Sequence, residues 1–209
     1  MPHHNRLNGL YVITDPTYCR PHGVVHAVAQ AIEGGARIVQ YRDKTASPKT
    51  KHEEAQALRL LCEQHDVLFL INDDVALAQE IGAHGVHLGQ SDQAVSEARL
   101  ALGADAIIGI TCHADLALAQ QAEQAGANYV ALGRFYPSHT KPEAPPATLD
   151  SLRHAKQQLS CPVAAIGGIT PDNAQPLRQA GADMLAVIHA VFGQADIRTA
   201  ASNIAQHFA

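Results

Sequence analysis

Short apolar runs of strand length recur along this chain, and most of them end in a polar cluster that precedes a helix-like stretch. The runs are rich in β-branched residues, as expected of parallel strands covered on both faces. The stretches between them include residues 24–33, 50–65, 116–124 and 172–179. About eight such units predict an α/β fold, a single (β/α)8 TIM barrel. The strands are expected to begin at Leu10, Arg37, Val67, Gly85, Ala106, Asn128, Pro162 and Met184.

A repeated Gly-Ala pair supports this reading. Each pair ends a helix-like stretch just before a strand, where glycine is favoured because the residue after a helix often adopts a left-handed conformation. Small residues are common in such turns, but five occurrences indicate a repeated unit. We expect one barrel domain over residues 1–209, with residues 1–8 as a short N-terminal tail. The pairs are Gly35-Ala36, Gly82-Ala83, Gly103-Ala104, Gly126-Ala127 and Gly181-Ala182.

Composition excludes several classes of function. The net charge of −5 argues against a nucleic-acid or anionic-membrane surface, which would need a basic face. No apolar run approaches the roughly 20 residues of a membrane-spanning helix, and the N-terminus does not resemble a signal peptide. The four cysteines form no C-x-x-C pair, which argues against a zinc site and fits reduced thiols. We therefore expect a soluble, cytoplasmic protein.

Gln40, Arg42 and Lys44 follow the second expected strand. Side chains at positions i, i+2 and i+4 of a strand share a face, so these three groups should project together. Arginine can bind phosphate oxygens with two parallel hydrogen bonds, and lysine adds a point charge. The alternative is a solvated strand end in which Asp43 pairs with a base.

Asp73 and Asp92 lie at the ends of the third and fourth expected strands. Neighbouring barrel strands bring such carboxylates close together, where they repel unless a cation lies between them. Mg²⁺ takes one or two protein carboxylates and completes its shell with water and phosphate oxygens. The alternative role, capping a helix, suits Asp74 and Ser91 better. Asn72 could hold a phosphate oxygen or orient an acid.

Gly167 and Gly168 follow the seventh expected strand and precede Thr170-Pro171, a usual helix start. Glycines allow the backbone to approach a phosphate closely, and barrel phosphate sites commonly use the loops after strands seven and eight. Residues 135–148 contain four prolines and cannot form a helix. They could form a mobile lid over the active face or a static loop.

Histidine is abundant, but no spacing resembles a metal-binding motif. His84 and His87 should point to opposite faces of a strand, and His3 and His4 belong to the tail. His113 and His189 fall at strand ends, where a functional role and an ordinary hydrogen-bonded one both remain open. No serine-histidine-aspartate triad can be recognised.

Five motifs in order resemble the thiamine phosphate synthase family, over about residues 10–192. The motifs are Q-Y-R-D-K, I-N-D-D, H-L-G-Q-S-D, Y-P-S-H-T-K and A-I-G-G-I. The resemblance implies a (β/α)8 barrel that couples a hydroxymethylpyrimidine diphosphate to a thiazole phosphate. The products are thiamine phosphate and pyrophosphate, Mg²⁺ is the cofactor, and a homo-oligomer is possible.

The resemblance also implies roles for individual residues. Gln40, Arg42, Lys44 and Asn72 would contact the pyrimidine diphosphate, and Asp73 and Asp92 would hold the magnesium. Thr111 takes the place of a small hydroxyl residue near the pyrimidine. Ser138, Thr140 and Lys141 would lie on the diphosphate and thiazole side. Gly168, Ile188 and His189 would lie beside the thiazole phosphate. The catalytic cations would be Arg42, Lys44 and Lys141.

Two positions depart from the family pattern, because Thr111 and His189 stand where serine is frequent. Threonine keeps the hydroxyl, whereas histidine is bulkier and titratable. Two other functions compete with the synthase. A thiazole tautomerase is similar in fold and sequence but typically lacks the complete Gln-x-Arg-x-Lys set and the second acid. A non-catalytic phosphate-binding barrel would have no use for two converging acids.

Overall fold

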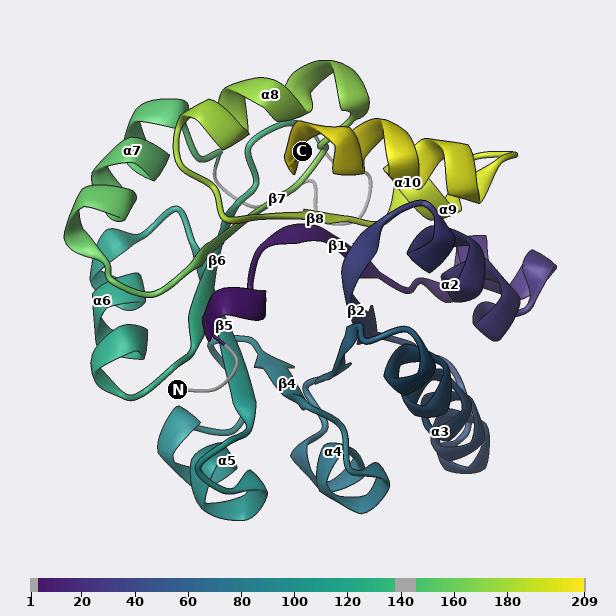
Figure 1. Cartoon of the computed structure of the whole chain (residues 1–209). Coiled ribbons are helices and arrows are strands. Elements are labelled where there is room, and N and C mark those ends of the chain that lie inside the picture. Colours follow the sequence, from purple (N-terminus) through teal and green to yellow (C-terminus); the bar gives the residue numbers. More distant parts are fainter. Residues whose placement is uncertain (1–3, 138–145, 209) are drawn as a thin grey trace.

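Eight parallel strands close into a barrel in which each strand pairs with its neighbours in sequence and β8 pairs with β1. The computed structural model describes residues 4–137 and 146–208. Helices surround the ring of strands (Figure 1), so the predicted (β/α)8 barrel is confirmed. Every strand begins within one residue of its expected start. The strands are β1 (Gly9–Ile13), β2 (Ala36–Tyr41), β3 (Leu68–Asn72), β4 (Gly85–Leu88), β5 (Ile107–His113), β6 (Tyr129–Gly133), β7 (Val163–Ile166) and β8 (Met184–Val187).

The outer layer consists of helices that follow the strands, with short extra helices after β1 and β8. The four helical stretches expected from sequence correspond to α2, α3, α6 and α8, with ends that differ by at most two residues. The helices are η1 (His4–Arg6), α1 (Pro16–Cys19), η2 (Arg20–His22), α2 (Val24–Glu33), α3 (Pro48–Gln64), α4 (Val75–Ile81), α5 (Val95–Leu102), α6 (Leu116–Gln124), α7 (Leu149–Gln158), α8 (Pro171–Gln179), α9 (His189–Phe192), α10 (Ile197–Ala205) and η3 (Gln206–Phe208).

Local sequence signals explain where the helices begin and end. Thr170 caps α8 and Pro171 occupies its first turn, as expected. Asp74 caps α4 by accepting from the Leu77 backbone N–H, also as expected. Helix α5, in contrast, follows Ala94, so Ser91 is not its cap. The glycines of all five Gly-Ala pairs have positive φ, which confirms the repeated turn.

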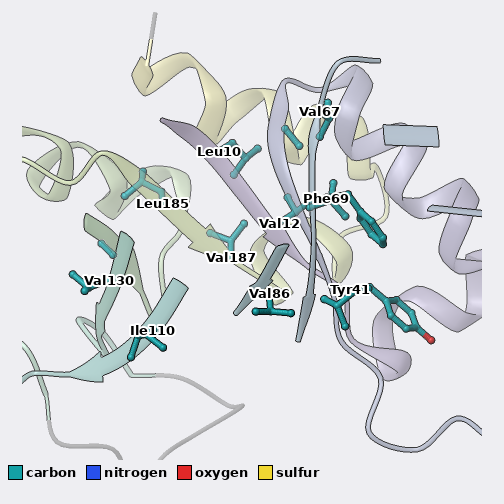
Figure 2. Packing of buried hydrophobic residues seen from close by; sticks show 14 of the residues in the cluster. Leu10, Val12, Tyr41, Val67, Phe69, Val86, Ile110, Val130, Leu185 and Val187 are labelled. Carbon is teal, nitrogen blue, oxygen red and sulfur yellow. The ribbon is translucent and has the colours of Figure 1, made fainter. Parts of the chain in front are cut away.

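Two apolar cores result from the alternation of side chains along the strands. Alternate residues such as Leu10 and Val12 face the helices, and Figure 2 shows them packed with Leu185, Val187 and Phe69. The intervening residues fill the barrel interior, and their cluster includes Leu7, Tyr11, Ile13, Ile38, Leu68, Leu70, Ile107, Tyr129, Ala131, Ala164, Met184 and Ala186.

Residues 4–8 of the expected N-terminal tail pack against the barrel. Leu7 is only 2% exposed and belongs to the interior cluster. The helix η1 just before it lies near the centre of the ring of strands in Figure 1. Nothing in the sequence of residues 1–8 indicates this packing. Among the residues that the structure describes, no helix has the length and apolar character needed to cross a bilayer.

Candidate active site

A cavity of about 280 Å³ opens where the strands end, at the C-terminal face of the barrel. Its lining combines apolar side chains, such as Ile13 and Ile166, with polar groups from several strands. Seven of the residues expected at the site lie around it: Gln40, Arg42, Asn72, Thr111, Gly168, Ile188 and His189. The topology therefore brings together residues almost 150 positions apart in sequence.

Arg42 is held at the mouth of the cavity by the two residues that follow β1. The backbone N–H of Arg42 donates to Thr14 Oγ1 at 2.8 Å, and the Thr14 hydroxyl donates back to the Arg42 carbonyl at 3.1 Å. The Arg42 Nη1 atom lies 3.6 Å from Asp15 Oδ2. Its side chain is only 20% exposed, so this cation is fixed in place before any anion binds.

Lys44 does not share the face of Gln40 and Arg42, contrary to the expectation from strand alternation. The strand β2 ends at Tyr41, and the chain then turns around the Asp43 carboxylate. As a result Lys44 lines a second hollow of about 570 Å³, together with Asn72 and Asp73. Asn72 lines both spaces, so the hollow adjoins the cavity.

The turn that carries Lys44 depends on Asp43, which is only 9% exposed. Its Oδ1 atom accepts from the backbone N–H groups of Thr45 and Ala46 and from the Thr45 hydroxyl, at 2.7 to 2.9 Å. Its Oδ2 atom accepts from Arg20 Nη2 at 2.9 Å. Burial by itself would raise the pKa of this carboxyl, but the bonds from Thr45 and Ala46 and the charge of Arg20 outweigh it and lower the pKa.

The carboxyl groups of Asp73 and Asp92 lie within hydrogen-bonding reach of each other. Asp73 follows β3 with a left-handed backbone, and Asp92 Oδ2 accepts from the Gly89 N–H at 2.6 Å. Burial raises the pKa of Asp73, and so do the bond to Asp92 and its negative charge, while Lys44 Nζ, 3.3 Å away, opposes the shift. Two acids this close must share a proton or a cation.

A family model described as thiamine monophosphate synthase matches residues 10–191. The chain belongs to the thiamine monophosphate synthase family. The thiamine-phosphate synthase of Alcanivorax borkumensis is 56% identical over 196 residues, which cover 94% of this chain and 90% of the relative. That of Nitrosococcus oceani is 50% identical over 202 residues, which cover 97% and 93%. This chain is therefore an enzyme, a transferase of thiamine biosynthesis, as the resemblance predicted.

Solved structures agree with the thiamine monophosphate synthase assignment. The thiamine phosphate pyrophosphorylase of Pyrococcus furiosus superposes with a TM-score of 0.89 at 36% identity, over 98% of this chain and 96% of that one. A 3-hexulose-6-phosphate synthase superposes with a TM-score of 0.69 at 18% identity, over 96% of this chain and all of that one. This second likeness concerns the fold alone.

The structure places ten of the thirteen residues that the family resemblance singled out. Seven line the cavity, Lys44 and Asp73 line the adjoining hollow, and Asp92 lies beside Asp73. The remaining three, Ser138, Thr140 and Lys141, lie outside the described residues, as does most of the proposed lid.

Several residues of the synthase site were not singled out from the sequence. His87, Arg134 and Thr170 also line the cavity, as does His113, for which the sequence leaves a functional and an ordinary role open. Thr14 and Asp15, which follow β1, anchor Arg42. The pairing of β1 with β2 would identify these two residues as neighbours of Arg42. In that pairing Ile13 lies opposite Gln40, and the Thr14 backbone N–H donates to the Gln40 carbonyl at the end of the two strands.

Proposed function

We propose that this site joins a hydroxymethylpyrimidine diphosphate to a thiazole phosphate, giving thiamine phosphate and pyrophosphate. The observation that carries the proposal is the junction at Asn72. On one side lies a partly apolar cavity that suits a heteroaromatic ring, and on the other lie an acid pair and Lys44, which suit a diphosphate and its counter-ion.

The acid pair fits Mg²⁺. Two carboxylates of adjacent strands converge, and the pKa of Asp73 is raised by burial and by its neighbour, so a cation between them would relieve the repulsion. Residues Asp73 and Asp92 would hold the ion, with diphosphate oxygens and water completing its shell. Bound there, Mg²⁺ would supply charge neutralisation for the leaving group.

The reaction requires positioning more than acid or base chemistry. The bond between the pyrimidine methylene carbon and the diphosphate oxygen breaks, and its electron pair leaves with pyrophosphate. The lone pair of the thiazole nitrogen then forms the new carbon–nitrogen bond to the resulting pyrimidine cation. Arg42 and Lys44 stabilise the departing negative charge, and we assign Lys141 to the same task.

No strong nucleophile is needed, which agrees with the state of the cysteines. All four thiols are buried, and burial raises the pKa of each to about 12. They are protonated at neutral pH and are therefore poor nucleophiles. The four are Cys19, Cys62, Cys112 and Cys161.

The thiazole phosphate is assigned to the side of the cavity that lies beyond β7 and β8. Gly167 and Gly168 both have positive φ there, and a Cβ on Gly168 would collide with the backbone of Tyr136 and Pro137. A side chain at this position is thus excluded, and Gly168 lines the cavity, so its backbone borders the space assigned to the phosphate. Ile188 and His189 border the same space. We assign Ser138 and Thr140 to the diphosphate and thiazole side.

Thiazole tautomerase activity is the closest alternative. The complete Gln40, Arg42 and Lys44 set and the paired acids favour the synthase, and so do the names of the relatives that are about half identical to this chain. A non-catalytic phosphate-binding barrel would not need an Asp73–Asp92 pair that is costly to keep ionised.

The test is to incubate the protein with both substrates and Mg²⁺ and to measure thiamine phosphate and pyrophosphate. Equal amounts of both products are expected, with activity lost in EDTA. Asp92→Asn should cut turnover by orders of magnitude, because it removes an acid proposed to hold the ion. The matched control is Asp150→Asn, an exposed acid that pairs only with Arg153 on its own helix among the described residues. Full activity in EDTA or in Asp92→Asn would refute the magnesium role.

A further inference from the structure

A continuous chain of hydrogen bonds runs through the barrel interior, just beneath the cavity. The Gln40 amide donates to the Tyr11 hydroxyl, which lies 2.8 Å from the Tyr129 hydroxyl. The Tyr129 hydroxyl is 2.8 Å from His87 Nδ1, and His87 Nε2 is 2.8 Å from Thr111 Oγ1. These five side chains come from five different strands, β2, β1, β6, β4 and β5.

The two tyrosines of this chain are sealed from solvent, whereas Gln40, His87 and Thr111 reach the cavity. Tyr11 and Tyr129 are 1% and 0% exposed, while Gln40 and Thr111 both line the cavity. Burial raises the pKa of both tyrosines far above neutrality, so each keeps its proton. A tyrosine fits at position 129 because its neighbour across the strands is Gly109, where any Cβ would overlap the Tyr129 ring.

A chain of this kind has a direction. Each hydroxyl carries one proton, and a neutral imidazole has one N–H and one bare nitrogen. If Gln40 donates to Tyr11, then Tyr11 donates to Tyr129 and Tyr129 donates to His87 Nδ1. The imidazole N–H is then on Nε2 and points to Thr111, which leaves the Thr111 proton available to the cavity. In the opposite direction the Gln40 amide would be turned over, so that its Oε1 accepts from Tyr11 and Thr111 donates to His87. The structure has the amide Nε2 toward Tyr11, which corresponds to the first direction.

We propose that Tyr11, Tyr129 and His87 are positioning residues that hold Gln40 as an acceptor and Thr111 as a donor toward the ligand. This inference rests on the proposed function, because an aminopyrimidine presents an exocyclic N–H donor beside a ring-nitrogen acceptor. The buried chain ties the two ends together, so a change of direction at one end would reverse the other. It thereby selects a ring whose edge carries both a donor and an acceptor.

The test is Tyr129→Phe, which breaks the chain at its centre and retains the ring. The matched control is Tyr41→Phe. The Tyr41 hydroxyl donates to Glu54 of α3 at 2.7 Å, and Tyr41 borders the second hollow but not the cavity assigned to the pyrimidine ring. The probes are two unreactive inhibitors, the pyrimidine alcohol monophosphate and the same compound with methyl in place of the amino group. The measurement is the ratio of their inhibition constants, with the KM for thiazole phosphate alongside.

Wild type and Tyr41→Phe should prefer the amino compound by about tenfold, the effect of one well-formed hydrogen bond, about 1.4 kcal/mol. Tyr129→Phe should lose most of this preference while its KM for thiazole phosphate stays unchanged. Tyr11→Phe breaks the same chain one link earlier and should give the same loss, and the double variant should lose no more. Additive losses, or a preference retained in both single variants, would overturn the inference.

The ligand-free protein gives an independent readout. Nitrogen NMR of labelled histidine should find the His87 proton on Nε2 in wild type and redistributed between the two nitrogens in Tyr129→Phe. This result does not depend on the reaction: if wild type makes no thiamine phosphate, the proposed function fails while the hydrogen-bond chain is still tested. A His87 proton on Nδ1 in wild type would overturn the direction assigned here.

Discussion

Asp43 offers a sharp test of how the site is built, because its two carboxylate oxygens accept hydrogen bonds from different residues. The Oδ1 atom accepts three hydrogen bonds from Thr45 and Ala46, and Oδ2 accepts one from Arg20. Asp43→Asn keeps an acceptor at Oδ1 but places an amide N–H₂ against Arg20, whereas Asp43→Ala removes both acceptor oxygens and all four hydrogen bonds. The turn that carries Lys44 should therefore survive the first change and not the second.

The contacts set the expected magnitudes. At about 1 kcal/mol for each hydrogen bond, and about 0.5 to 1 kcal/mol for the pair with the half-exposed Arg20, Asp43→Ala should lower the free energy of unfolding by about 3 to 4 kcal/mol. Asp43→Asn should lower it by about 1 kcal/mol. For a chain of this size these losses correspond to melting temperatures lower by about 6 to 16 °C and 2 to 4 °C.

The pH dependence of the difference between wild type and Asp43→Asn follows from the lowered pKa of Asp43. A carboxyl whose pKa is lower in the folded state stabilises the protein fully above its unfolded pKa of about 3.9. That stabilisation is lost as the pH falls through the folded pKa. The advantage of wild type over Asp43→Asn should therefore be constant from pH 8 to 5 and shrink below pH 4.

Urea unfolding of the three proteins over this pH range is the assay. Activity is measured in parallel at a temperature where all three are folded. Asp43→Ala should raise the KM for the pyrimidine diphosphate, because Lys44 loses its position, and Asp43→Asn should raise it less. Equal destabilisation by both variants would refute the claim that the bonds to Oδ1 contribute most of the stability, since it would make the ion pair of Oδ2 with Arg20 the dominant contact.

Three other outcomes are expected. Asp73→Asn should raise the melting temperature of the metal-free protein near pH 7 while cutting turnover, because the raised pKa of Asp73 means that its charge costs stability above that pKa; calorimetry showing a lower melting temperature would contradict this. Arg42→Ala should weaken the diphosphate substrate more than the thiazole phosphate, and Arg42→Lys should restore it only in part because the two-pronged contact is lost; equal losses for both substrates would place Arg42 elsewhere. An aromatic disulfide reagent should label no cysteine of the native protein at pH 8 and all four after unfolding, since the thiols are buried with pKa values of about 12; rapid labelling of the folded chain would contradict their burial.

The barrel could be predicted from sequence because its signals are local. Apolar runs of strand length and five Gly-Ala turns fix where strands begin, and closure follows from eight repeats. The polar strand ends identified much of the site for the same reason, since parallel strands end on one face. The position of Asp73 beside Asp92 thus follows from neighbouring strand ends alone.

The rest depends on contacts that no local pattern contains. Lys44 does not share the face of Gln40, because β2 ends at Tyr41 and the turn around Asp43 interrupts the alternation of side chains. Asp43 in that turn accepts a hydrogen bond from Arg20, which is 23 residues away in sequence. The buried Tyr11–Tyr129 pair joins residues 118 positions apart. Each tyrosine reads as an ordinary strand residue until the register of the closed barrel is known.

The most direct test of the account is a crystal structure of this protein with Mg²⁺, pyrophosphate and thiamine phosphate. We predict the pyrimidine ring between Gln40 and Thr111, with the metal on Asp73 and Asp92. Pyrophosphate should lie at the junction marked by Asn72, within reach of both Arg42 and Lys44. A pyrophosphate bound away from the acid pair, or a ring that does not contact Gln40 and Thr111, would contradict it.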